Sequence, residues 1–111
     1  MQTVHTQYKH CDVIKANGRI DSATAPALGT AFSALTDQGR YHLVFDMSEV
    51  EFISSAGLRV LISTQKICKR YNRGELVLAN VPANILASLE LAGFNVLFKI
   101  YDDLLTAVGN F

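Results

Sequence analysis

Residues 41–58 read YHLVFDMSEVEFISSAGL, and this stretch predicts a strand, a loop and a helix in succession. Its first part, Tyr41–Met47, is β-branched and aromatic with an unbroken apolar run, which is typical of a strand buried on both faces. Val50–Ile53 predicts a further short extended piece. Apolar residues then recur at helical spacing from near Gly57 to about Tyr71. Together these segments form one half of a β-α-β unit.

The same alternation of strands and helices continues on both sides of this stretch. The other predicted strands are Val4–Tyr8, Asp12–Ala16 (ending at Asn17-Gly18 or just beyond), Glu75–Ala79 and Asn95–Ile100. The other predicted helices run from Asp21-Ser22, with Pro26 in the first turn, to near Gly39, from Pro82 past Leu89, and over Asp102–Val108. The order β-β-α-β-α-β-α-β-α predicts one α/β domain over residues 1–111, with a mostly parallel sheet of about five strands and four helices.

Composition and charge limit the kinds of molecule that the chain is expected to bind. Half of the 111 residues are hydrophobic, which is enough for a core in a single domain. Ten Lys and Arg balance ten Asp and Glu, so no long-range positive field attracts a phosphate backbone, and nucleic acid is a poor expectation. A net charge near zero favours association with protein instead.

The sequence also predicts a cytoplasmic chain without a membrane-inserted segment. The start, MQTVHTQYKH, lacks the apolar run of a signal peptide, and polar residues interrupt the apolar stretch Ile85–Ile100. Cys11 and Cys68 belong to no regular framework, which favours reduced thiols over a disulfide.

Enzyme and metal motifs are missing from the sequence. Ile53 stands where a G-x-S-x-G motif around Ser55 would need its first glycine, and no H-E-x-x-H, Walker A or G-x-G-x-x-G pattern occurs. His5, His10 and Cys11 lack a second ligand pair, so a metal site there is disfavoured. We expect neither a cofactor nor a catalytic role.

Two connections at the carboxyl ends of predicted strands carry the polar residues of interest. They are Gly18–Thr24 and Asp46–Gly57, and open α/β sheets place functional loops at this edge. Asp21 and Asp46 each end a predicted strand, so we expect them at the same edge as Ser55. One serine of the Ser54-Ser55 pair should cap the following helix, and a phosphate on such a serine would be favoured by the helix N-terminus.

Residues 18–25 (GRIDSATA) followed by 46–58 (DMSEVEFISSAGL) resemble the STAS domain, and more closely the stand-alone anti-sigma factor antagonists of bacteria. The resemblance covers essentially the whole chain. It implies a partner switch in which the unphosphorylated chain binds an anti-sigma factor that is also a serine kinase of the GHKL ATPase type, which frees the sigma factor. Phosphorylation would break that complex, and a PP2C-type phosphatase would reset it.

The family pattern, with the acceptor two residues before a glycine, makes Ser55 the implied phosphorylation site. Ser54 stands where an aspartate is common, which removes a negative charge beside the acceptor and leaves Ser54 open as a less favoured site. The partner-binding residues that we expect are Asp21, Ser22, Thr24, Asp46, Ser48, Ser54, Ser55, Gly57 and Arg59.

Two other readings compete with this switch. The chain could be a STAS binding subunit of a signalling scaffold or of a lipid-transport ABC system, with the serine serving only as a helix cap. The third interpretation, an enzyme with Ser55 as nucleophile and His42 or Asp46 as base, has the least support. No sequence motif places either base within hydrogen-bonding reach of the Ser55 hydroxyl.

Overall fold

The computed structural model describes residues 1–111. The strands are β1 (Thr3–Gln7), β2 (Asp12–Ile20), β3 (His42–Ile53), β4 (Glu75–Ala79) and β5 (Ile100–Tyr101). The helices are α1 (Ala25–Thr36), α2 (Ser55–Lys69), α3 (Ala83–Leu91) and α4 (Leu104–Gly109), with 3₁₀ turns η1 (Arg70–Asn72) and η2 (Phe94–Val96). The predicted α/β class, with five strands and four helices in that order, is confirmed.

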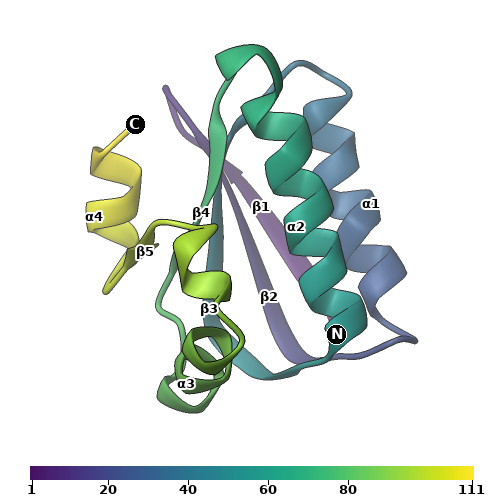
Figure 1. The fold of residues 1–111 in the computed structure, drawn as a ribbon. Coiled ribbons are helices and arrows are strands. Elements are labelled where there is room, and N and C mark those ends of the chain that lie inside the picture. Colours follow the sequence, from purple (N-terminus) through teal and green to yellow (C-terminus); the bar gives the residue numbers. More distant parts are fainter.

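The five strands form one mixed sheet in the order β1-β2-β3-β4-β5. β1 pairs antiparallel with β2, and every other neighbouring pair is parallel. Figure 1 shows α1 and α2 side by side on one face of the sheet, whereas α4 lies on the other side. None of the helices combines the length and the apolar character that a membrane span requires.

β3 supplies apolar side chains to both faces of the sheet. Leu43, Phe45 and Met47 are fully buried on the face that α1, α2 and α3 cover. On that face Phe45 meets Phe32 of α1 edge-to-face, with ring centroids 5.4 Å apart. Val44 points to the opposite face, where a smaller apolar cluster includes Ala107 of α4. The continuous apolar run in the sequence therefore marks a strand buried on both sides.

The structure corrects two predicted strands. β3 is one strand of 12 residues, so the polar pair Ser48-Glu49 lies within it and is not a turn. β2 continues to Ile20 beside it through two register shifts, which allow polar positions to stay in the ladder. The predicted strand over Asn95–Ile100 is wrong for most of its length, because η2 occupies its start and only Ile100–Tyr101 pairs with β4.

Three helix starts also differ from the predicted ones. α1 begins at Ala25, because a hydrogen-bonded turn occupies the residues that follow Asp21. α2 begins at Ser55 instead of Gly57, and α4 is capped by Asp103 instead of Asp102.

A close approach fixes α2 against the ends of β2 and β3. A methyl group added at Gly57 would lie 2.7 Å from side-chain carbons of both Ile20 and Ile53, nearer than carbon atoms approach each other in folded proteins. The N–H of Ser54 donates to the carbonyl of Ile20 at 2.8 Å in the same place. These contacts hold the start of α2 at the carboxyl ends of the two strands.

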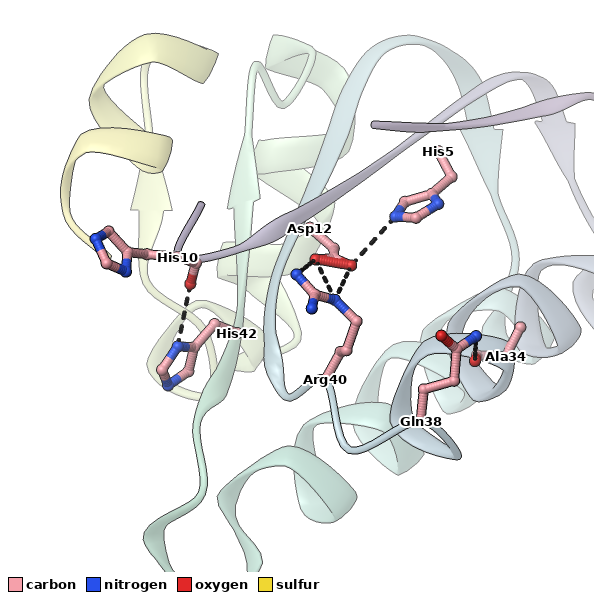
Figure 2. Close-up of polar contacts among 7 residues, drawn as sticks. All are labelled: His5, His10, Asp12, Ala34, Gln38, Arg40 and His42. Atoms are coloured by element: carbon pink, nitrogen blue, oxygen red, sulfur yellow. Dashed lines mark hydrogen bonds and ion pairs between the residues drawn. The ribbon is translucent and has the colours of Figure 1, made fainter. Parts of the chain in front are cut away.

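A buried carboxylate stands at the opposite end of β2 (Figure 2). Asp12 is 1% exposed, and its oxygens accept hydrogen bonds from Nε of Arg40 at 2.6 and 2.7 Å and contact Nε2 of His5 at 3.2 Å. Burial opposes the ionised form of Asp12. The hydrogen bonds and charges of Arg40 and His5 outweigh burial and hold the pKa of Asp12 below its ordinary value.

Replacement of Gly57 by alanine should destabilise the fold by roughly 1–3 kcal/mol, because the added methyl overpacks the helix start. Gly29→Ala is the matched control within α1, where the new methyl would meet Val60 at an ordinary 3.8 Å. Its better helix propensity should raise stability by up to about 1 kcal/mol. Urea unfolding measures both variants. Equal effects of the two substitutions would contradict the close approach.

Stability should fall with acid partly through Asp12. Its pKa is lower in the folded chain than in the unfolded chain, so its contribution is present above about pH 4 and disappears as the pH falls through the folded-state value. Asp12→Asn should therefore cost roughly 1–3 kcal/mol at pH 7, and the penalty should shrink as the pH falls below about 4. Asp37→Asn, at an exposed residue outside every ion pair, is the control and should stay within about 0.5 kcal/mol. A constant penalty for Asp12→Asn over the pH range would refute this role.

Candidate functional site

The connections after β2 and β3 meet at one end of the sheet. Ile20 and Ile53 are register partners at the last rung of the ladder, and Ser54 follows with its N–H bonded to Ile20. The start of α1 and the start of α2 therefore lie together, as Figure 1 shows at the lower ends of both helices. This places Asp21 and Ser22 beside Ser54 and Ser55, as the sequence predicts.

The residues 21–24 form a closed turn. The Asp21 carboxylate accepts hydrogen bonds from the N–H groups of Thr24 at 3.1 Å and Ala23 at 3.0 Å. The Thr24 hydroxyl donates to the carbonyl of Arg19 at 2.9 Å and accepts the N–H of Asp21 at 2.9 Å. Hydrogen bonds from the backbone of Thr24 and Ala23 lower the pKa of Asp21, so the carboxylate is held ionised. Asp21 and Thr24 thus shape the loop that presents Ser22.

The two serines at the start of α2 differ in what their hydroxyls do. Ser54 is the N-cap, with extended backbone angles and a side-chain oxygen that accepts the N–H of Gly57 at 3.4 Å. Ser55 is the first helical residue and is exposed, and its hydroxyl makes no hydrogen bond within the chain. The predicted capping serine is therefore Ser54, whereas the Ser55 hydroxyl is free to react.

A groove between α1 and α2 opens next to Ser55. Its cavity of about 420 Å³ is mostly apolar, and Ser22 and Arg59 both line it. Arg59 is exposed and lies four residues after Ser55, on the same face of α2. The remaining lining residues are mostly small: Ala25, Pro26, Gly29, Ser33, Thr36, Ala56, Val60, Ser63, Thr64 and Ile67.

The structure does not bring Asp46 and Ser48 to this end. Asp46 is 4% exposed and lies within β3, where its carboxylate accepts the N–H of Ser48 at 3.0 Å and the amide of Asn80 at 3.3 Å. Ile53 lies seven positions farther along the strand, which corresponds to roughly 23 Å. The expectation that Asp46 ends a strand beside Ser55 is wrong, because β3 continues past β4.

Sequence reasoning missed two features that border the site. The Arg19 guanidinium stacks over the Phe52 ring at 4.3 Å from its centroid, on the parts of β2 and β3 that lead to the serines. The small residues Ala25, Gly29 and Ser33, spaced by four along α1, line the groove. That spacing was a usable signal for a helix face with a groove.

Neither of the two bases considered in the sequence, His42 and Asp46, lies beside the Ser55 hydroxyl. His42 lies in a separate cavity with Lys9 and Arg40, and the Asp46 carboxylate is engaged elsewhere. Cys11 and Cys68 are both free and buried, and burial raises the pKa of Cys68 to about 11. No group of three or more His, Cys, Asp or Glu side chains is arranged to hold a metal ion. What the site presents is an exposed hydroxyl beside an apolar groove.

Comparison with known proteins gives the family. The STAS domain family model matches residues 3–107. The chain is 34% identical to BtrV of Bordetella bronchiseptica over 83 residues, which are 75% of this chain and 71% of that protein. It is also 33% identical over 97 residues, 86% of this chain and 80% of the other, to RsfB of Mycobacterium tuberculosis, an anti-sigma-F factor antagonist.

A solved structure agrees with these relatives. The crystal structure of an anti-sigma factor antagonist from Mycobacterium paratuberculosis superposes with a TM-score of 0.87 at 28% identity, over 98% of this chain and 92% of that one. This chain therefore belongs to the STAS domain family.

Alanine substitutions at Ser54 and Ser55 should differ in their effect on the free energy of unfolding. Ser54→Ala removes the cap and should cost roughly 1 kcal/mol, whereas Ser55→Ala removes an unbonded hydroxyl and should stay within about 0.5 kcal/mol. Ser54→Asp keeps a capping oxygen and is the control that should recover the wild-type value. Urea midpoints with a common slope measure all three variants. A larger loss for Ser55→Ala than for Ser54→Ala would reverse the assignment of the cap.

Proposed function

We propose that this STAS-domain chain is an anti-sigma factor antagonist that works by partner switching. Its unphosphorylated form binds an anti-sigma factor and releases the sigma factor, and phosphorylation of Ser55 abolishes that binding. The observation that carries the proposal is the free, exposed hydroxyl of Ser55 at the start of α2, next to a serine already used as the cap. The relatives named as anti-sigma factor antagonists support the same role.

A phosphate on Ser55 would be stabilised by the start of α2 but would disrupt an interface with a bound partner. It would add about −1.5 to −2 charges, which the N–H groups and dipole of the first turn of α2 favour. The fold would therefore tolerate the modification. A partner that covers the neighbouring apolar groove would have to bury or displace a strongly hydrated group, and its binding would be lost.

The partner surface that we propose surrounds Ser55 on two helices. Ser22 and Arg59 line the groove from α1 and α2, and Arg59 offers a charged group at its edge. Gly57 contributes indirectly, because its missing side chain allows the close approach that sets the start of α2. Ser48 and Asp46 lie apart from this surface, so the proposed contact does not need them.

The proposed cycle consists of a phosphoryl transfer to Ser55 and a later hydrolysis. A serine kinase of the GHKL ATPase type, the anti-sigma factor itself, transfers the γ-phosphoryl group of ATP to the Ser55 oxygen. The kinase takes the hydroxyl proton, and ADP leaves. A PP2C-type phosphatase then uses water to hydrolyse the phosphoserine, which releases inorganic phosphate and restores the hydroxyl. This chain supplies the acceptor and the binding surface and performs no catalytic step.

Ser54 is the less suitable acceptor for a structural reason. Its oxygen accepts the N–H of Gly57, and its backbone N–H is bonded to Ile20. Phosphorylation there would change the residue that closes the helix, whereas the Ser55 oxygen can react without disturbing a bond of the fold. We therefore assign the switch to Ser55.

The test measures binding to the partner kinase recovered from the native host. Wild type and Ser55→Ala should bind with similar affinity, and Ser55→Asp should bind at least tenfold more weakly, about 1.4 kcal/mol. With ATP, the kinase should release wild type but keep Ser55→Ala. Titration calorimetry gives the affinities, and intact-mass spectrometry should find one phosphate on wild type and none on Ser55→Ala.

Ser88→Asp is the control for added charge, because Ser88 is exposed on α3 outside the groove. It should bind the kinase as wild type does. Equal affinity of Ser55→Ala and Ser55→Asp would overturn the switch. If all the variants recover the same transporter ATPase or multi-STAS assembly, the chain is a binding subunit of another complex.

A further inference from the structure

A second cavity lies at the end of the sheet opposite Ser55. Its volume is about 260 Å³, and its walls are largely polar. Three connections form it: the turn between β1 and β2, the segment between α1 and β3, and the residues that precede β4. The lining residues that carry charge or an imidazole are Lys9, His10, Asp12, Arg40, His42 and Arg73.

The one carboxylate in this cavity is already neutralised. Asp12 is buried and bonded to Arg40, with Nη2 of Arg40 2.5 Å from its oxygen, and His5 contacts it from β1. Figure 2 shows both partners directed at the carboxylate. Lys9 takes part in none of the four salt bridges of the chain. After the Asp12–Arg40 pair is set aside, the cavity keeps the positive charges of Lys9 and Arg73.

Contacts with the rest of the fold hold one wall of the cavity, made by Arg73 and His42, in place. The Arg73 guanidinium lies 3.8 Å from the centre of the Tyr41 ring and donates to the Tyr41 hydroxyl at 2.7 Å. Nδ1 of His42 lies 3.2 Å from the carbonyl of His10, and its ring stacks on Phe111 at 5.2 Å. Groups fixed in advance lose little conformational entropy when an anion binds, so this wall is prepared for one.

A neighbouring hollow extends the positive charge. It shares His42 with the first cavity and is lined by Lys69 and Lys99, while its one acid, Glu75, is paired with Lys99 at 3.1 Å. The two hollows together carry five of the ten Lys and Arg side chains: Lys9, Arg40, Lys69, Arg73 and Lys99. The chain has zero net charge, so this end is positive at the expense of the remaining surface.

We propose that the cavity between Lys9 and Arg73 is a binding site for a small phosphate-class anion. A recessed polar cavity of this size admits a phosphate or pyrophosphate group, whereas a nucleic acid or a membrane would need a broader, more convex cationic surface. Lysine and arginine donors recognise phosphate oxygens by charge-assisted hydrogen bonds. The site is independent of Ser55 and of the proposed partner switch.

The test is an amide NMR titration of the full chain with inorganic phosphate and with pyrophosphate, at ionic strength held constant with sodium chloride. Saturable shifts should concentrate at residues 9–11 and 39–42 and be absent at 54–57. Pyrophosphate should bind more tightly than phosphate, because it carries more charge. Ser55→Asp should bind both anions as wild type does, which separates this test from the test of the switch.

Lys9→Gln should weaken pyrophosphate binding roughly tenfold, the loss of one charge-assisted contact. Lys66→Gln is the matched control, since Lys66 is an exposed cation of α2 that lines neither hollow, and its affinity should stay within about twofold. Arg40 is left intact in these variants because its loss would strand the buried Asp12 carboxylate.

Three results would overturn the site. One is the absence of saturation up to about 20 mM of either anion, an affinity too weak for a specific site. Another is equal weakening by Lys9→Gln and Lys66→Gln, which would indicate general charge attraction. The third is sedimentation of the chain with phosphatidylglycerol vesicles in the absence of any response to the free anions, which would assign the positive end to a lipid headgroup.

Discussion

The fold depends on the burial of one segment of β3, Leu43–Met47, on both of its faces. A strand in that position has no solvent-facing side, so its residues must be apolar in succession, and its parallel neighbours must be reached by crossover helices. Leu43, Phe45 and Met47 gather α1, α2 and α3 on one face, and Val44 meets the cluster beneath α4 on the other. Polar side chains that could bind a partner or ligand therefore gather at the two ends of the sheet.

Much of this arrangement could be predicted from the sequence. β4 was predicted with its observed bounds. Pro26 lies in the first turn of α1 as predicted, although the helix begins at Ala25 and not at Asp21-Ser22, and Gly39 follows the end of the helix at a positive φ of 79°. Local signals suffice there because a proline or a glycine acts through its own backbone. The capping role within the serine pair was likewise predicted, although only the structure assigns it to Ser54.

The failures arose where distant pairing overrode local pattern. Ser48 and Glu49 are polar neighbours that favour a turn. β2 nevertheless pairs with Glu49 and the residues after it, beyond the last residue that pairs with β4, so β3 continues. The wrong prediction that Asp46 ends a strand beside Ser55 followed from placing the end of that strand at Met47. The other wrong prediction was the strand over Asn95–Ile100. Phe98 is buried in the core but is not part of a strand, and an apolar run in the sequence does not distinguish a buried turn from a buried strand.

Adjacent serines at the start of α2 divide two tasks between them. One hydroxyl closes the helix, and the other contributes no bond to the native state. Natural selection can therefore act on the two positions separately. Under the proposed switch, a lineage could lose or regain regulation through changes at Ser55 while the protein keeps its abundance in the cell. Drift at Ser54 would be restrained by folding in either case.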